Sequence, residues 1–539
     1  MNLSVGLRRL DVVVAVVLAG VMLAAGAWRM VPGVVGAVHD DGVYVSTAKS
    51  IAAGQGYRLV NLPGEPPQTK YPILYPAVLA IVWMLVPAFP QNAVFMQWTS
   101  LTAAAIGVGL AYLFLVRFGY ASRAAAGAGA LLAALTPMFV YLSTLTMSES
   151  VFGLLMVVAL WGAERAAIRG PGSRRSQIVT GIGLALPFLC RGFGLAVPAG
   201  VGLASLRARR SLMVATATAA AMIGAWMAWS WLALRATPPG VAGYYTNYAD
   251  SVAATFTVNA PRILAINAML LLTSTVGLAL DGLRRLGPAW SFGLVQVFLV
   301  AGLVAWIAIV RDAWRGQILP ACLLMYGALA VVWPWPPPRF LVPVLPLLVP
   351  IAFSSTGRLV ARLPVPIPSA GRAAGVVILA IALAGHVMSL RDVGSLSRAA
   401  GYPFDSGVTG QVNVATWAGY RDLFAWIRDH TRDDDVVACG LDTMVYLYTD
   451  RQGFRPAVYH PEASYGVPVS PIGAPTEVRD LLIGGGADYL VLVPGYSEHE
   501  ALARTVTAIQ AESPDLLQPV YSGSDARFVV YKVRREQAR

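Results

Sequence analysis

The chain has 539 residues, of which 57% are hydrophobic and 13% are charged, whereas soluble domains carry about 25% charged residues. Apolar runs long enough to cross a bilayer, about 20 residues each, recur along the first 390 residues. These features exclude an ordinary soluble protein and predict a polytopic α-helical membrane protein.

The net charge of +12 is unevenly distributed. Residues 1–391 contain 27 lysines and arginines against 9 acidic residues, and residues 392–539 contain 13 against 19. The basic excess lies in short links between apolar runs, where it sets membrane orientation and does not indicate nucleic acid binding. We therefore expect a transmembrane domain over 1–391 and a soluble domain over 392–539.

The first apolar run, about 11–36, follows Arg8 and Arg9, which place the N-terminus in the cytoplasm. The run is too long for a cleaved signal peptide, and further spans follow it. Residues 72–90 are apolar but rich in proline, so we expect a helix at the outer interface. Further spans are expected at about 93–116, 124–143, 149–167, 177–190, 193–206, 211–234, 289–310, 317–334, 340–354 and 373–390.

The apolar segment 264–280 leaves two topologies open. If it crosses the membrane, Arg311 and Arg315 lie outside, and if it lies in the interface, both lie in the cytoplasm, as the charge rule favours. We prefer the second topology. It gives about eleven spans, with twelve or thirteen as alternatives, and it places residues 392–539 outside the cytoplasm.

The C-terminal region has the pattern of a small α/β domain. Three valine-rich runs, 434–440, 487–493 and 526–533, predict strands, and 420–430 and 498–512 predict amphipathic helices. The glycines at 484–486 lead into a strand and not a helix, so no phosphate loop is indicated. The three cysteines have no paired spacing and predict neither disulfides nor a metal site.

Two adjacent carboxylates, Asp40 and Asp41, directly follow the first span. Only nine acidic residues occur in the first 391, and a carboxylate beside hydrocarbon is costly, so this pair favours a functional role. The alternative is that both side chains are simply solvated in an external loop. His39 precedes the pair and raises the question of a metal site, but one adjacent triplet does not make a tetrahedral site.

The sequence around this pair resembles the first external loop of the GT-C class of membrane glycosyltransferases. That class includes the protein O-mannosyltransferases and the bacterial enzyme that transfers aminoarabinose to lipid A. Its pattern is an acidic pair, an aromatic residue four positions on, a small-residue helix ending in glycine, and a later Lys/Arg-x-Pro. Here these are Asp40-Asp41, Tyr44, the segment ending at Gly54 and Gly56, and Lys70-Tyr71-Pro72. The Asp-Asp pair departs mildly from the Asp-Glu of many relatives.

Three later stretches resemble the same class: "TMSESVFG" (146–153), "CRGFG" (190–194) and "WPPPRFLVPVLP" (335–346). The tail also resembles the external domain of its bacterial branch. The resemblance implies a GT-C-like fold of about eleven to thirteen transmembrane helices with a C-terminal soluble α/β domain. It also implies a glycosyltransferase that takes a sugar from a polyprenyl-phosphate donor, and a lipid, polysaccharide or protein as acceptor.

Under this resemblance Asp40 is the general base for the acceptor hydroxyl, and Asp41 positions the acceptor or a neighbouring base. A single displacement would invert the sugar's configuration. Lys70 and Arg339 are expected on the donor phosphate, where fixed positive charge stabilises the leaving group. Arg191 is a third candidate, with a snorkelling interfacial arginine as the alternative. Tyr44, Tyr71 and Glu149 are expected to bind substrate, although Glu149 could instead be a helix N-terminal charge.

Two other classes of function remain open, a secondary transporter or lipid flippase, and a non-catalytic cell-envelope assembly protein. A transporter should carry ionisable residues near mid-membrane, whereas the acidic residues here gather at the outer edge. Lysine occurs three times against 37 arginines, which indicates a high-GC bacterium and hence a bacterial cytoplasmic membrane. No cofactor is predicted, a divalent cation is left open, and the sugar, acceptor and oligomeric state are not indicated.

Overall fold

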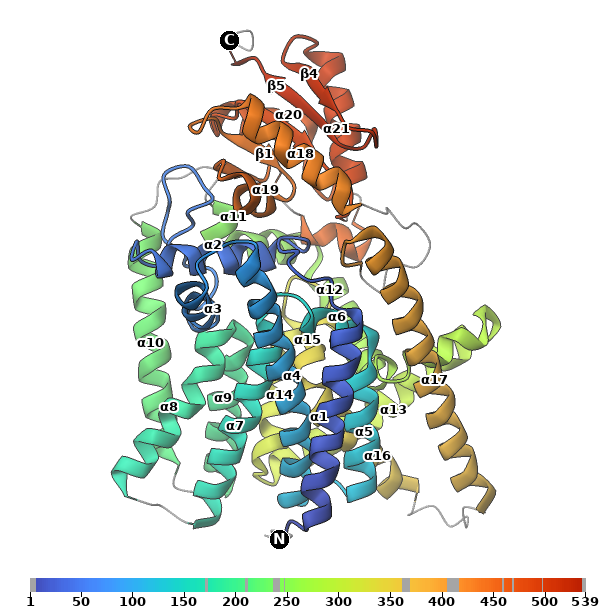
Figure 1. Ribbon diagram of the computed structural model, residues 1–539. Helices are drawn as coiled ribbons and strands as arrows, with labels where there is room; N and C mark the ends of the chain where they lie inside the picture. The colour runs from blue at the N-terminus through green and yellow to red at the C-terminus, as the bar shows by residue number, and fades with distance from the viewer. Residues whose placement is uncertain are drawn as a thin grey trace.

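The computed structural model describes residues 6–169, 173–208, 212–235, 243–246, 248–360, 369–404, 416–457, 460–467, 470–496 and 498–535. A bundle of long helices carries a small domain of helices and strands at one end, and the chain begins at the opposite end (Figure 1). Helix α2 (Asp40–Ala52) lies across the end of the bundle, beneath the small domain (Figure 1). The predicted class, a polytopic helical protein with a C-terminal α/β region, is confirmed.

Eight helical segments within the described residues have the length and apolar character needed to cross a membrane. They are α1 (Arg9–Arg29), α4 (Gln91–Arg117), α7 (Ser148–Arg169), α10 (Met213–Arg235), Asn259–Gly277 of α12 (Ala249–Gly277), Phe292–Trp314 of α13 (Pro288–Trp314), Pro338–Leu359, and Ala373–Ala400 of α17 (Ser369–Ala400). The segment from Pro338 combines α15 (Pro338–Leu341), η3 (Val342–Val344) and α16 (Leu345–Val360).

A bent pair of helices adds a ninth candidate span. The predicted span 124–143 is divided into α5 (Arg123–Leu135) and α6 (Pro137–Ser143), which meet at 63°. Pro137 begins the second helix, where its missing N–H costs nothing, and the restriction it places on Thr136 ends the first helix. The shorter apolar helices are α3 (Leu74–Leu85), η1 (Gly192–Leu195) with α9 (Ala196–Ala208), and α14 (Ile318–Val331). Helix α8 (Arg174–Cys190) lies between α7 and η1 in the chain.

Close packing between helices depends on small residues. A Cβ added at Gly109 of α4 would come within 2.8 Å of the Ala15 carbonyl oxygen in α1, and one at Gly129 of α5 would meet Pro350 of α16 at 2.7 Å. Helices in a bilayer gain little from hydrophobic exclusion of each other's surfaces, so close approach at small residues supplies the contact energy. These glycines bring the backbones of α1, α4, α5 and α16 together.

Contacts between helix ends show which links share one end of the bundle. Arg123 pairs with Asp11 at 2.7 Å, near the start of the chain, and Arg358 approaches Asp312 to 3.9 Å. The guanidinium of Arg207 lies 3.5 Å from the Trp314 ring centroid. The end of α13 therefore lies on the same side as the other arginine-rich links, as the preferred topology predicts for Arg311 and Arg315.

Segment 264–280 lies within α12 and the turn that follows it. Length and composition admit Asn259–Gly277 as a span, but η2 (Asp281–Leu286) packs against the middle of α17. A Cβ at Gly282 would meet the Ala382 carbonyl oxygen at 2.1 Å. The chain therefore reverses beside the interior of α17 before α13 continues toward the N-terminal end of the bundle.

The C-terminal domain is built on a five-stranded sheet of order β2-β1-β3-β5-β4. The strands are β1 (Val437–Cys439), β2 (Gly453–Phe454), β3 (Tyr489–Leu492), β4 (Leu517–Ser522) and β5 (Val529–Val533). Strand β1 is parallel to β2 and β3, and β5 is antiparallel to β3 and β4. Its helices are α18 (Trp417–His430), α19 (Asp442–Thr449), η4 (Pro461–Tyr465), α20 (Pro475–Gly484) and α21 (His499–Glu512). The three predicted strands and two predicted helices are confirmed, whereas α19, α20, β2 and β4 were not predicted.

The segment between α1 and α3 completes the core on both sides of this sheet. Val31, Val34 and Ala37 are buried with α18, α19 and β3 side chains, and Val43, Leu59 and Leu62 are buried with the residues on the opposite face. Burial of these apolar side chains stabilises the contact by roughly 1.5–3 kcal/mol for each fully buried large residue. The C-terminal domain and residues 31–62, which we call the first external segment, therefore form one packed unit.

We predict that Gly36→Ala weakens this contact. Gly36 has a φ of +91°, and an added Cβ would lie 2.6 Å from the Met444 Cβ and 2.8 Å from its Cα. Overpacking against backbone costs about 1–3 kcal/mol. Thermal unfolding and limited proteolysis in detergent measure the loss. Gly54→Ala is the matched control, because φ is +73° there but nothing lies within 4 Å, so equal effects would contradict the prediction.

Candidate active site

The two adjacent carboxylates occupy different environments. Helix α2 begins at Asp40, and the Asp41 side chain turns back to accept hydrogen bonds from the N–H groups of Gly36 (2.8 Å) and Val38 (3.1 Å). Asp41 is fully buried, and burial raises the pKa of its carboxyl although these N–H groups oppose the shift. Asp41 does not line the cavity described below, whereas Asp40 does.

Asp40 is held by two partners from distant segments and lies close to the side chain of the preceding residue, His39. The Tyr71 hydroxyl donates to Oδ1 at 2.8 Å, and Arg339 donates to Oδ2 at 2.8 Å. His39 Nδ1 lies 4.0 Å from Oδ1. Burial opposes ionisation, but the charges of Arg339 and His39 and the hydrogen bond from Arg339 hold the pKa of Asp40 well below its ordinary value. Asp40 is therefore an ionised carboxylate at any physiological pH.

Glu149 lies behind the two arginines and joins them. Its Oε1 is 3.1 Å from Arg339 Nε and 3.3 Å from Arg191 Nη1, and its side chain is fully buried. Arg191 also donates to the Ser148 hydroxyl at 2.9 Å, which in turn contacts the Tyr44 hydroxyl at 3.0 Å. A buried carboxylate needs such pairing. Glu149 therefore orients both guanidinium groups and does not itself line the cavity.

Lys70 is a further cation, close enough to Asp40 for their charges to interact. Its backbone N–H donates to the Gln68 side chain at 2.8 Å, and its ammonium lies 4.6 Å from the Tyr248 ring centroid and 5.6 Å from that of Tyr71. Burial lowers the pKa of Lys70 to about 8, although Asp40 opposes the shift. Lys70 is thus a cation whose charge changes close to neutral pH.

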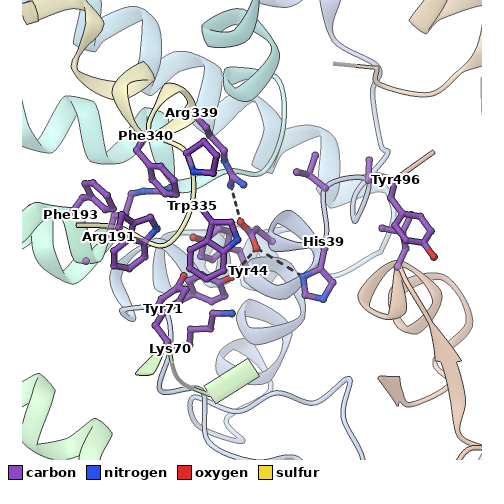
Figure 2. A pocket seen from close by; sticks show the side chains of 18 of the residues that line it. His39, Tyr44, Lys70, Tyr71, Arg191, Phe193, Trp335, Arg339, Phe340 and Tyr496 are labelled. Carbon is purple, nitrogen blue, oxygen red and sulfur yellow. Dashed lines mark hydrogen bonds and ion pairs between the residues drawn. The ribbon is translucent and has the colours of Figure 1, made fainter. Parts of the chain in front are cut away.

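These groups line one cavity of about 1180 Å³. Asp40, Lys70, Arg191 and Arg339 all reach it, and Figure 2 shows the labelled cations directed toward the same space. Aromatic rings form much of the wall of the cavity. Among them are Trp333 and Trp335, whose ring centroids are 5.9 Å apart. The other aromatic residues of the wall are Tyr44, Tyr71, Tyr141, Phe188, Phe193, Trp226, Tyr248, Phe340, Phe404 and Tyr496.

The structure brings together most of the predicted site residues. Asp40, Lys70 and Arg339 line the cavity with Tyr44 and Tyr71. Arg191 also lines the cavity and is paired with Glu149, so it is more than a snorkelling side chain. Asp41 and Glu149 lie outside the lining, one in the turn before α2 and the other behind the arginines.

Several cavity residues were not predicted. Arg455, Tyr496 and Glu498 reach the cavity from the C-terminal domain, where Arg455 lies 3.5 Å from Glu498. Charged residues are common in a soluble domain, so nothing in the sequence marks Arg455 or Glu498 as a site residue. A carboxylate beside hydrocarbon, in contrast, is unusual enough to stand out. Trp333 and Trp335 precede Arg339 in a proline-rich stretch. Their closeness to Arg339 in the sequence was the signal that could have identified them as cavity residues. Within the described residues, no group of three or more His, Cys, Asp or Glu side chains is arranged to hold a metal ion.

No family model and no curated protein sequence matches this chain. Among solved structures, the oligosaccharyltransferase AglB from Archaeoglobus fulgidus, in complex with an inhibitory peptide and a dolichol-phosphate, gives a TM-score of 0.54 at 12% identity, covering 98% of this chain and 74% of that chain. ArnT from Cupriavidus metallidurans in the apo state gives 0.50 at 17% identity, covering 97% of this chain and 98% of that chain. The chain has the predicted fold, that of the GT-C membrane glycosyltransferases.

We predict that Glu149→Gln destabilises the protein by about 1–3 kcal/mol, because Arg191 and Arg339 lose their shared counter-ion in a buried position. The effect stays in the low part of this range, since water reaches part of Arg339. Thermal unfolding in detergent measures it. Glu500→Gln is the control, because Glu500 pairs loosely with Arg504 at 3.8 Å in an exposed position. A wild-type midpoint for Glu149→Gln would contradict the structural role.

Proposed function

We propose that this protein is a membrane glycosyltransferase that moves a sugar from a polyprenyl-phosphate donor to an acceptor outside the cytoplasm. The observation that carries the proposal is one cavity, with many aromatic residues in its wall, into which Asp40 reaches together with the cations Lys70, Arg191 and Arg339. The chemistry of transfer needs these groups together: a proton acceptor, fixed positive charge for a phosphate leaving group, and flat apolar surfaces for a sugar ring.

The orientation follows from the positive-inside rule. Arginines of the links near Arg123, Arg207 and Arg358 share the N-terminal end of the bundle, so that end is cytoplasmic. The cavity and the C-terminal domain then lie on the side of the membrane away from the cytoplasm. The membrane itself is a bacterial cytoplasmic membrane. We retain the division into a transmembrane catalytic domain and an external α/β domain, while noting that α17 continues unbroken to Ala400.

The donor would enter from the bilayer with its phosphate near the cations. The cavity extends to Phe188 of α8 and to Trp226 and Met227 of α10. Helix α10 lies at the outside of the bundle, where large apolar side chains such as Met227 are exposed. This apolar arm suits the polyprenyl chain. Arg339 offers two N–H groups in a fork, and Lys70 offers a point charge, so both can neutralise the phosphate as it leaves. Arg191 adds a third positive charge.

Asp40 would act on the acceptor. As the acceptor oxygen attacks the anomeric carbon, the C–O bond to the phosphate breaks, and the acceptor proton passes to Asp40. The displaced product is the anionic lipid phosphate. A single displacement of this kind inverts the anomeric configuration, since no enzyme-bound sugar forms. Asp41 supports this role indirectly, because its hydrogen bonds to the turn set the start of α2.

We predict that Asp40→Asn lowers transfer by about 10²–10⁴-fold, because the amide cannot accept the proton. Purified protein should be assayed against a panel of polyprenyl-phosphate hexoses and pentoses, with retained folding shown by thermal unfolding. Asp41→Asn is the contrasting variant. It should lower the unfolding midpoint, and any remaining folded protein should transfer sugar. A folded Asp40→Asn protein with wild-type activity would remove Asp40 from the chemistry.

We predict that kcat/KM falls as the pH rises above about 8, because Lys70 loses the charge that attracts the donor phosphodiester. The ratio kcat/KM reports ionisations of the free enzyme, for which this pKa applies. Lys70→Arg should keep its charge throughout and move this basic limb to higher pH. An unchanged limb in the Lys70→Arg variant would show that another group titrates there.

A further inference from the structure

His39 occupies a strained turn directly before the proposed base. Its φ and ψ are +64° and −58°, and the Asp40 N–H donates to the Val38 carbonyl at 2.8 Å, which closes a γ-turn around His39. This form of γ-turn is rare, and such a backbone costs about 1–3 kcal/mol. Strain of this kind persists only where surrounding structure imposes it, and it clusters at functional sites.

The C-terminal domain imposes this turn through α19. The Thr443 hydroxyl donates to the His39 carbonyl at 3.4 Å, and a Cβ added at Gly42 would lie 2.2 Å from that hydroxyl oxygen. Gly36, on the other side of the turn, packs against Met444 in the same way. The first turn of α19 therefore encloses the backbone on both sides of His39.

The imidazole of His39 lies between two carboxylates. Its Nε2 is 3.0 Å from Asp442 Oδ1, and its Nδ1 is 4.0 Å from Asp40 Oδ1. Figure 2 shows the ring on the cavity side of the turn, with its contact to the central carboxylate marked. Asp442 is the first residue of α19, its side chain is completely buried, and its Oδ2 accepts from Asn61 at 2.9 Å. Asp442 thus has a fixed position against the ring.

The charges around the ring come from several elements. Asp40 lies on α2 and Asp442 on α19, while Arg455, after β2, opposes protonation, and the Tyr245 ring of α11 (Gly243–Thr246) lies 5.7 Å away. Burial lowers the pKa of His39, but the two carboxylates outweigh burial and raise it above its ordinary value. When protonated, this imidazole places a second positive charge beside Asp40, on the side away from Arg339.

We propose that His39 and Asp442 are positioning residues for the reaction: Asp442 orients the imidazole, and the imidazole, on the side of Asp40 away from Arg339, keeps that carboxylate directed at the acceptor. This inference rests on the proposed function, in which Asp40 is the base. It assigns the C-terminal domain a part in the chemistry, because the group that orients His39 belongs to that domain. A carboxylate that fixes a histidine acting on a reacting group is an established arrangement in enzymes.

The test uses full-length Asp442→Asn, His39→Gln and the double variant, assayed with the polyprenyl-phosphate hexose or pentose on which the wild type is active. Each single variant should lower kcat at least about tenfold, less than the loss of the base itself. The acidic limb of kcat/KM should move to higher pH, because Asp40 loses a cationic neighbour. The double variant should match the single variants, since the two residues act as a unit.

Asp450→Asn is the matched control. Asp450 is the C-cap residue that directly follows the same helix, pairs with Lys49 of α2 at 2.6 Å, and is largely exposed. It therefore links the same two elements without touching the cavity, and asparagine tolerates its left-handed backbone. This variant should keep the wild-type kcat and acidic limb.

The outcomes distinguish a failure of the proposed function from a failure of the inference about His39 and Asp442. A wild-type protein that transfers no sugar from any donor overturns the proposed function. An active wild type whose folded Asp442→Asn and His39→Gln variants behave like Asp450→Asn overturns the inference alone, as does strict additivity in the double variant. If Asp442→Asn does not fold, His39→Gln decides by the same two measurements, because it leaves the Asp442–Asn61 contact in place.

Discussion

The site depends on the neutralisation of charge at the buried end of a helix bundle. Arg339 lies between Asp40 and Glu149, and Glu149 also pairs with Arg191. Glu149 is fully buried and the other three side chains are partly buried, and taking such groups out of water costs several kcal/mol for each ion, so each needs the opposite charges beside it. Segments separated by up to 299 residues must therefore meet at one place. Asp40, Arg191 and Arg339 line the cavity at this place, and Glu149 lies behind them.

The need to neutralise charge also gives two neighbouring carboxylates, Asp40 and Asp41, different partners. Successive residues at the start of a helix point in different directions, so the turn before α2 captures Asp41 while Asp40 faces the cavity. Asp41 interacts with backbone N–H groups and Asp40 with cations, and the pKa values of the two carboxyl groups move in opposite directions. A pair of adjacent acids in a sequence can thus combine a residue that fixes a turn with one that lines a cavity.

Much of the membrane part could be predicted, because burying charge in hydrocarbon is so costly that each exception is visible in the sequence. Asp40, Lys70 and Arg339 stand out in this way, and they do line one cavity. The bend at Thr136–Pro137 was less visible, since both halves are apolar. Asp442 could not be predicted from its sequence context. A carboxylate in a soluble domain is ordinary, and only the packing of α19 against the first external segment brings it to His39.

The shared core of the C-terminal domain and residues 31–62 also bears on how the protein is made. The ribosome releases the early part of this unit soon after α1, but the strands that bury Val43 and Leu59 are the last to emerge. Until then the first external segment lacks part of the core that packs against it. A chain that stops before β5 would therefore contain the helix bundle but an incomplete core over residues 31–62.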